Sequence, residues 1–222
     1  MKDKKVILQS ILTQGMLPLF YWESASVSLE VIRTLYRAGI RSLEYTNRGE
    51  AALENFRNMK KTLISEAPDL YLGIGTIKTA VEARAFIEAG ADFIVAPIVN
   101  PKVAETAGKA GLLWIPGCMT PTEIYQAQQL QAALIKIFPA NILGPEFISS
   151  IRELFQGQLF MPTGGVELNR ENIHTWFKAG VCAVGMGSKL ISKDVLKNES
   201  YDVLYKNTVT ALALVKSVID DN

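Results

Sequence analysis

A single lysine within an apolar run has the clearest chemical potential in this sequence. Lys136 lies inside residues 133–139, Ala-Leu-Ile-Lys-Ile-Phe-Pro, which have the length and composition of a buried strand. Burial lowers the pKa of a lysine, and a neutral amine can attack a carbonyl carbon to form a Schiff base. Alternatively, a lysine near a strand end extends its ammonium group to solvent. The run alone leaves both interpretations open.

Three polar side chains alternate along another strand-like segment. Glu44, Thr46 and Arg48 are two residues apart, so on a strand they share one face, with Leu43 and Tyr45 on the other. A charged pair and a hydroxyl on an inner face are unfavourable unless they have partners or a function. The pattern therefore favours a functional site, and a solvated strand end with a local ion pair is the alternative.

Three glycine-containing segments follow other strand-like runs. Residues 73–76, Gly-Ile-Gly-Thr, lack the third glycine of a dinucleotide fingerprint. They instead predict close approach of the backbone to a small ligand, with the Thr76 hydroxyl offered to a carboxylate. Residues 162–165, Pro-Thr-Gly-Gly, and 185–188, Gly-Met-Gly-Ser, are typical of turns whose backbone N–H groups hold phosphate.

Strand and helix patterns alternate along the chain. The predicted strands cover 16–21, 42–47, 70–75, 93–96, 113–115, 134–138, 159–162 and 182–185. The predicted helices cover 28–38, 50–65, 79–89, 103–110, 122–132, 145–155, 169–178 and 201–219, and an amphipathic helix covers 3–14. Eight such units favour a single-domain (β/α)8 TIM barrel over residues 1–222, and a doubly wound open sheet is the alternative.

A barrel of this kind would bring the chemical residues together. Its active site lies at the C-terminal ends of the strands. The second and sixth of eight strands are opposed, so we expect Glu44 and Lys136 to face each other across the mouth. Phe138 shares the face of Lys136 and would help to exclude water from the amine, and Pro97 would shape the pocket wall.

Composition excludes several classes of protein. Of the 222 residues 49% are hydrophobic, and the net charge of +1 favours neither nucleic acid nor a membrane surface as a partner. Cys118 and Cys182 form no metal-binding or disulfide pattern, which fits a reducing compartment. No apolar stretch approaches the roughly 20 residues of a membrane span. We expect a cytoplasmic protein.

Taken together, five segments resemble those of one enzyme family. They begin at residues 43, 73, 135, 162 and 187 and read Leu-Glu-Tyr-Thr-Asn-Arg, Gly-Ile-Gly-Thr, Ile-Lys-Ile-Phe-Pro-Ala, Pro-Thr-Gly-Gly-Val and Gly-Ser. The chain thereby resembles the class I aldolases that cleave 2-keto-3-deoxy-6-phosphogluconate (KDPG) or 4-hydroxy-2-oxoglutarate (KHG) to pyruvate and an aldehyde.

The resemblance implies a role for each matching residue. Lys136 would form the Schiff base, and Glu44 would be the general acid and base. Arg48 and Thr76 would hold the pyruvyl carboxylate. The distal end of the substrate, with any phosphate, would bind to Thr163, Gly164, Gly165, Gly187 and Ser188. The resemblance also implies a small 2-keto acid as substrate, no metal or other cofactor, an extra N-terminal helix and a homotrimer.

Some positions depart from the family pattern. Family members usually carry an aliphatic residue in place of Asn47, often a glycine in place of Ile98, and several have a basic residue near Tyr21. Two other functions fit the same barrel: a phosphosugar isomerase or epimerase, and a non-catalytic barrel that binds a sugar acid. Neither gives Lys136 a covalent role.

Overall fold

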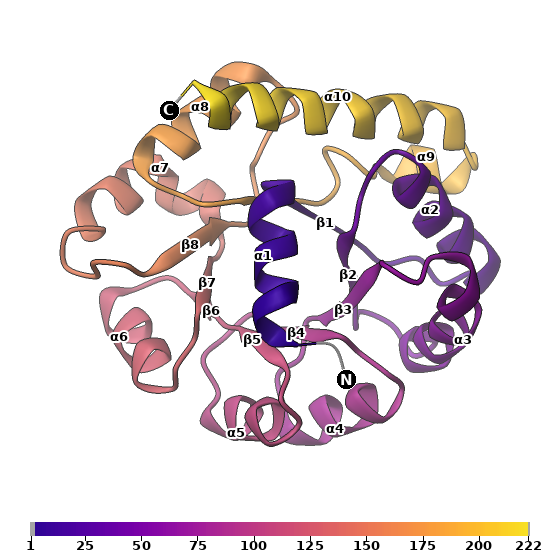
Figure 1. Cartoon of the computed structure of the whole chain (residues 1–222), viewed down its shortest axis with the longest axis horizontal. Helices are drawn as coiled ribbons and strands as arrows, with labels where there is room; N and C mark the ends of the chain where they lie inside the picture. Colours follow the sequence, from indigo (N-terminus) through magenta and orange to yellow (C-terminus); the bar gives the residue numbers. More distant parts are fainter. Residues whose placement is uncertain (1–2, 222) are drawn as a thin grey trace.

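Parallel strands form a curled sheet at the centre of the computed structural model, which describes residues 3–221 (Figure 1). The runs predicted as strands adopt this conformation because their apolar, often β-branched side chains are buried on both faces. The strands are β1 (Met16–Phe20), β2 (Ser42–Thr46), β3 (Tyr71–Gly75), β4 (Phe93–Val95), β5 (Leu113–Ile115), β6 (Gly117–Cys118), β7 (Leu134–Ile137), β8 (Leu159–Pro162) and β9 (Val184–Met186).

The strands follow one another around a TIM-barrel-like α/β fold. Hydrogen-bonded pairs give the order β5-β4-β3-β2-β1-β9 and the order β6-β7-β8, and the pairings are parallel. The predicted fifth strand is β5, and β6 is a further short strand beyond Pro116 that was not predicted. A bridge between Thr163 and Gly185 connects the end of β8 to β9. The C-terminal ends of the strands therefore gather at one end of the sheet.

Helices surround the strands (Figure 1). Two of them begin with a capping box, in which Thr79 pairs with Glu82 and Thr120 with Glu123. The helices are α1 (Lys4–Gln14), α2 (Ala25–Arg37), α3 (Ala52–Glu66), α4 (Ala80–Glu88), α5 (Pro101–Lys109), α6 (Pro121–Gln129), α7 (Ala140–Ile151), α8 (Arg170–Ala179), α9 (Lys193–Lys197) and α10 (Tyr201–Asp220). Within residues 3–221 no helix has the length and apolar character needed to cross a membrane.

Two apolar layers hold the fold together. A larger cluster fills the space between sheet and helices, and a smaller one fills the interior of the curled sheet. Ile7 and Ile11 of α1 are fully buried in the interior cluster, together with Leu17 and Phe93. Helix α1, which crosses the strands in Figure 1, therefore covers one end of the sheet. The other end is left for the polar residues.

A glutamine secures the junction between α1 and the sheet. The Gln14 amide donates hydrogen bonds to the carbonyls of Met16 and Ser42 at 2.6 and 2.8 Å. Its oxygen accepts from the backbone N–H groups of Arg41 and Ser42 at 2.6 and 3.0 Å. One side chain thus satisfies four backbone groups at the starts of β1 and β2.

The helix prediction was incomplete in two places. Helix α7 starts at Ala140, five residues before the predicted start, and Gly144 interrupts it with a left-handed φ of 73° ahead of Pro145. Helix α9 was not predicted. It has five residues, too few to show a helical repeat, and the side chain of Ser192 caps it by accepting from Val195 N–H.

Candidate active site

Lys136 occupies the third position of β7, inside the curled sheet. Its neighbours Ile135 and Ile137 belong to the layer that packs against the helices, so alternation directs Lys136 inward. The lysine is only 4% exposed, and its Nζ lies 4.9 Å from the centre of the Phe138 ring. Burial lowers the pKa of Lys136. The structure therefore favours the buried lysine over one that extends to solvent.

Glu44 is the acidic group of the same interior. It is 1% exposed, while Leu43 and Tyr45 on either side pack toward the helices. No described residue forms a hydrogen bond with either oxygen of its carboxyl group. Burial raises the pKa of Glu44, and the positive charges of Lys136 and Arg48 oppose this rise.

The two buried groups lie on opposed strands. In one direction around the ring, β3, β4 and the pair β5 and β6 lie between β2 and β7. In the other direction, β1, β9 and β8 lie between them. Burial favours the uncharged form of both side chains, although the charge of Glu44 raises the pKa of Lys136. Both shifts are toward the form that such chemistry needs, a neutral amine as nucleophile at Lys136 and a protonated carboxyl as proton donor at Glu44.

Arg48 does not share the strand face of Glu44, contrary to the prediction. Strand β2 ends at Thr46, and the N–H of Arg48 donates to the Thr46 carbonyl at 2.9 Å, so the chain turns there. The Thr46 hydroxyl lies within the sheet and donates to the Phe20 carbonyl at 3.4 Å. Arg48 is exposed, yet its charge lowers the pKa of both Glu44 and Lys136. It therefore reaches the site from the loop after β2.

The two glycines of β3 make room for protein side chains, which corrects the expectation that they admit a ligand. A Cβ on Gly73 would lie 2.2 Å from Cε2 of Phe93 in the interior cluster. A Cβ on Gly75 would lie 1.6 Å from Oε1 of Glu44. These contacts are far shorter than any van der Waals contact, so both positions require glycine for packing.

Thr76 has an unusual backbone conformation directly after β3. Its φ of 63° is left-handed, which is strained for a β-branched residue and is found most often at functional sites. Thr76 and Pro97 are half-buried, and neither lies on the wall of the cavity described next. The Pro97 carbonyl instead lies 2.6 Å from the position of a Cβ on Gly117, at the start of β6.

A cavity of about 270 Å³ opens at the C-terminal ends of β1, β8 and β9. Neither Lys136 nor Glu44 is on its wall, but it brings together most of the other residues predicted to bind the substrate. Those on its wall are Arg48, Phe138, Thr163, Gly164, Gly165, Gly187 and Ser188.

The turn after β8 has the conformation that its glycines predict. Gly164 and Gly165 have φ values of 93° and 81°, which disfavour other residues. A Cβ on Gly165 would lie 2.5 Å from Cβ of Asn141 in the first turn of α7. The Thr163 hydroxyl is buried without a hydrogen-bond partner in the described chain, and a Cβ on Gly185 would lie 2.3 Å from it. The Thr163 hydroxyl therefore keeps hydrogen-bonding capacity that no described residue uses.

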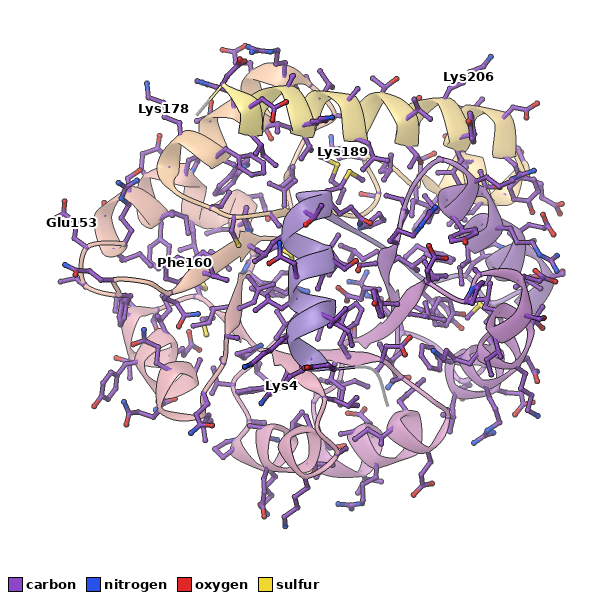
Figure 2. The ribbon with its side chains drawn as sticks, in the orientation of Figure 1. Lys4, Glu153, Phe160, Lys178, Lys189 and Lys206 are labelled. Atoms are coloured by element: carbon purple, nitrogen blue, oxygen red, sulfur yellow. The ribbon has the colours of Figure 1, made fainter. Side chains whose placement is uncertain are left out.

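Three polar residues of the cavity wall were missed by the sequence prediction. Tyr21 follows β1, and its hydroxyl packs against Gly49, where a Cβ would lie 2.0 Å away. Lys189, labelled in Figure 2, and Lys193 follow β9. Both lysines lie within six residues of the predicted Gly-Ser turn in the sequence, and this closeness could have indicated them. The position of Lys193 depends on α9, however, and this helix is too short to show a helical pattern in the sequence.

Comparison with known proteins gives a consistent result. A family model for KDPG and KHG aldolase matches residues 7–207. The 2-dehydro-3-deoxy-phosphogluconate aldolase of Dickeya dadantii (strain 3937) is 30% identical over 215 residues, which are 96% of this chain and 96% of that protein.

Two solved structures have similar folds. The 4-hydroxy-2-oxoglutarate aldolase/2-deydro-3-deoxyphosphogluconate aldolase from TTHB1 is 31% identical with a TM-score of 0.80, covering 94% of this chain and 98% of that one. The KDPG aldolase of Legionella pneumophila, with pyruvate captured as a covalent carbinolamine, is 23% identical with a TM-score of 0.82. That match covers 91% of this chain and 96% of the other, and at this identity it shows the fold alone.

Proposed function

This chain belongs to the KDPG and KHG aldolase family and is a lyase, and we propose that Lys136 forms the Schiff base through which it cleaves its substrate. The substrate is a 2-keto-3-deoxy sugar acid phosphate of the KDPG type, or KHG. The products are pyruvate and an aldehyde, which is glyceraldehyde 3-phosphate or glyoxylate. The buried Lys136 amine on the strand opposite Glu44 is the observation that carries this proposal.

The first step joins the substrate to the protein. The neutral Lys136 amine adds to the C2 ketone carbon and forms a carbinolamine, which loses water to leave a protonated imine. The lowered pKa of Lys136 favours the neutral amine, and the Phe138 ring limits access of water to it. Glu44, whose pKa is raised, donates the proton that the departing water requires.

The second step breaks the carbon–carbon bond. The Glu44 carboxylate takes the proton of the C4 hydroxyl, directly or through a water molecule, and the aldehyde leaves as C3–C4 breaks. The bonding electrons move into the imine and give an enamine. Protonation of C3 and addition of water to the imine then release pyruvate and restore the free amine of Lys136.

The remaining residues position the two ends of the substrate. Arg48 forms the ion pair with the pyruvyl carboxylate, and Thr76 adds a hydrogen bond to it. The turns that contain Thr163, Gly164, Gly165, Gly187 and Ser188 receive the distal end, with backbone N–H groups for a phosphate. The positive φ values of the two adjacent glycines support this role.

The proposal also covers the organisation of the protein. It takes residues 1–222 as one (β/α)8 barrel domain with α1 as the extra N-terminal helix, working in the cytoplasm as a homotrimer without a metal or cofactor. The family resemblance supports the trimer, and the two unpaired cysteines are compatible with a reducing compartment.

Reductive trapping tests the covalent step. Incubation with pyruvate and borohydride should leave a carboxyethyl group on Lys136, located by peptide mass spectrometry. Lys60 is a suitable internal control, because it is a partly buried lysine that pairs with Asp92 at 2.6 Å and should stay unmodified. If the protein releases pyruvate from KDPG while Lys136 remains unmodified, the mechanism is wrong. An isomerase or a binding protein would give neither the adduct nor pyruvate.

A further inference from the structure

Positive side chains line the cavity at its distal end. Lys189 and Lys193 lie on its wall with Gly187 and Ser188, and Arg48, assigned above to the pyruvyl carboxylate, is a third cation on the same wall. No Asp or Glu is among the described residues on this wall. The cavity therefore has a positive potential beyond what the backbone N–H groups of the glycine turns provide.

The two lysines differ in how far their charge is compensated. Lys189 Nζ lies 2.8 Å from Oε1 of Glu167, so it is paired before any ligand arrives. Lys193 takes part in none of the ion pairs found among residues 3–221. Lys193 is thus the cation at this end of the cavity that a ligand can use without first breaking an ion pair.

We propose that Lys193 sets the preference of this aldolase for a doubly charged, phosphorylated distal end over an uncharged one, and that Glu167 restrains this preference by pairing with Lys189. This inference rests on the proposed function and deepens it. The interaction of a cation with a dianion is about twice that with a monoanion at the same distance, and it vanishes for a hydroxyl group. Lys193 is exposed, so its effect is moderate and depends on salt.

The test compares KDPG with unphosphorylated 2-keto-3-deoxygluconate. Lys193→Gln should raise KM for KDPG about two- to fivefold, as expected for an exposed charge pair, and leave KM for the unphosphorylated acid unchanged. Lys193→Arg should retain the wild-type ratio. Lys197→Gln is the matched control, because Lys197 ends the same helix but is not on the cavity wall.

Glu167→Gln should act in the opposite direction. It frees Lys189 and should lower KM for KDPG, with a smaller difference from wild type at high ionic strength. Equal ratios of the two KM values in wild type, Lys193→Gln and Glu167→Gln would overturn the inference while leaving the aldolase function intact.

A measurement without turnover separates the two proposals. Titration calorimetry with inorganic phosphate should show weaker binding by Lys193→Gln and stronger binding by Glu167→Gln, whether or not KDPG is cleaved. Unchanged phosphate affinity in both variants contradicts the role of Lys193. Absence of pyruvate release, with the expected changes in phosphate affinity, contradicts the aldolase function alone.

Discussion

The Glu44 carboxyl group lies directly against the backbone of Gly75, where a Cβ would be 1.6 Å from Oε1 of Glu44. The two residues are on neighbouring strands, since Thr46 of β2 pairs with Gly75 of β3. Because neither oxygen of Glu44 has a hydrogen-bond partner among residues 3–221, packing is what holds this carboxyl group in place. The absence of a side chain at position 75 is thus a condition for the position of the acid.

Gly75→Ala should therefore impair catalysis through Glu44. The added methyl group must displace the carboxyl group, and an error of about 1 Å in such a group can reduce the rate about 10²-fold. Glu44→Gln sets the scale, with an expected loss of about 10²–10⁴-fold for removal of a general acid and base. The measurement is kcat for pyruvate release from KDPG.

Gly73→Ala is the matched control for this prediction. Its methyl group would collide with Phe93 instead of Glu44. Gly73→Ala should therefore lower the melting temperature, while the protein that remains folded loses much less kcat than Gly75→Ala does. A folded Gly75→Ala protein with wild-type kcat would show that the position of Glu44 does not depend on Gly75.

The sequence predicted the buried pair because both residues interrupt strand patterns that are otherwise apolar. Strand order then placed Glu44 opposite Lys136, since parallel β/α units can close in few ways. Arg48 was assigned to the wrong strand face because a turn between Thr46 and Arg48 ends the alternation, although it does lie at the site. Only the hydrogen bonds of the backbone reveal such a turn.

Contacts between distant segments were also beyond the sequence. The glycines of β3 suggested a ligand, but Phe93 and Glu44 fill the space beside them. Gln14 looked like an ordinary helical residue, although it bonds to backbone groups of residues up to 28 positions away. Each of these roles depends on which side chains meet in three dimensions, and local patterns do not encode that.

Arg48 should influence both substrate binding and the titration of Lys136. Arg48→Gln removes the proposed partner of the pyruvyl carboxylate and should raise KM about tenfold or more, as expected for loss of a hydrogen bond to a charged group. Because the charge of Arg48 lowers the pKa of Lys136, its removal should raise that pKa. The rate of borohydride trapping, measured against pH, should then reach its plateau at a higher pH than in wild type.

Two further variants complete this experiment. Arg152→Gln removes a cation directly after α7, outside the cavity wall, and should leave the pH profile unchanged. A raised KM with an unshifted profile would mean that Arg48 binds the carboxylate without affecting Lys136. A shifted profile with normal KM would exclude Arg48 from substrate binding.

The buried Lys136 should make the fold less stable than a neutral residue would, in a pH-dependent way. Its pKa is lowered in the folded state, so the unfolded chain binds more protons between that lowered pKa and about 10.4, the value in an unfolded chain. The contribution of Lys136 to the free energy of unfolding therefore becomes more favourable to the folded state as pH rises across this window. The penalty from Lys136 is largest below the folded-state pKa and disappears above about pH 10.4.

The test compares the Glu44→Gln protein with the double variant that also carries Lys136→Met. Glu44→Gln removes the titration of the buried carboxyl group, so the two proteins differ only in the titration of Lys136. Urea unfolding at pH 7 should show the Met variant to be more stable, because methionine fills a similar volume without a charge. The difference should shrink at pH 10, where the unfolded lysine is also losing its proton. An equal difference at both pH values would mean that the folded-state pKa of Lys136 is normal, and the neutral nucleophile on which the Schiff-base mechanism depends would lose its physical basis.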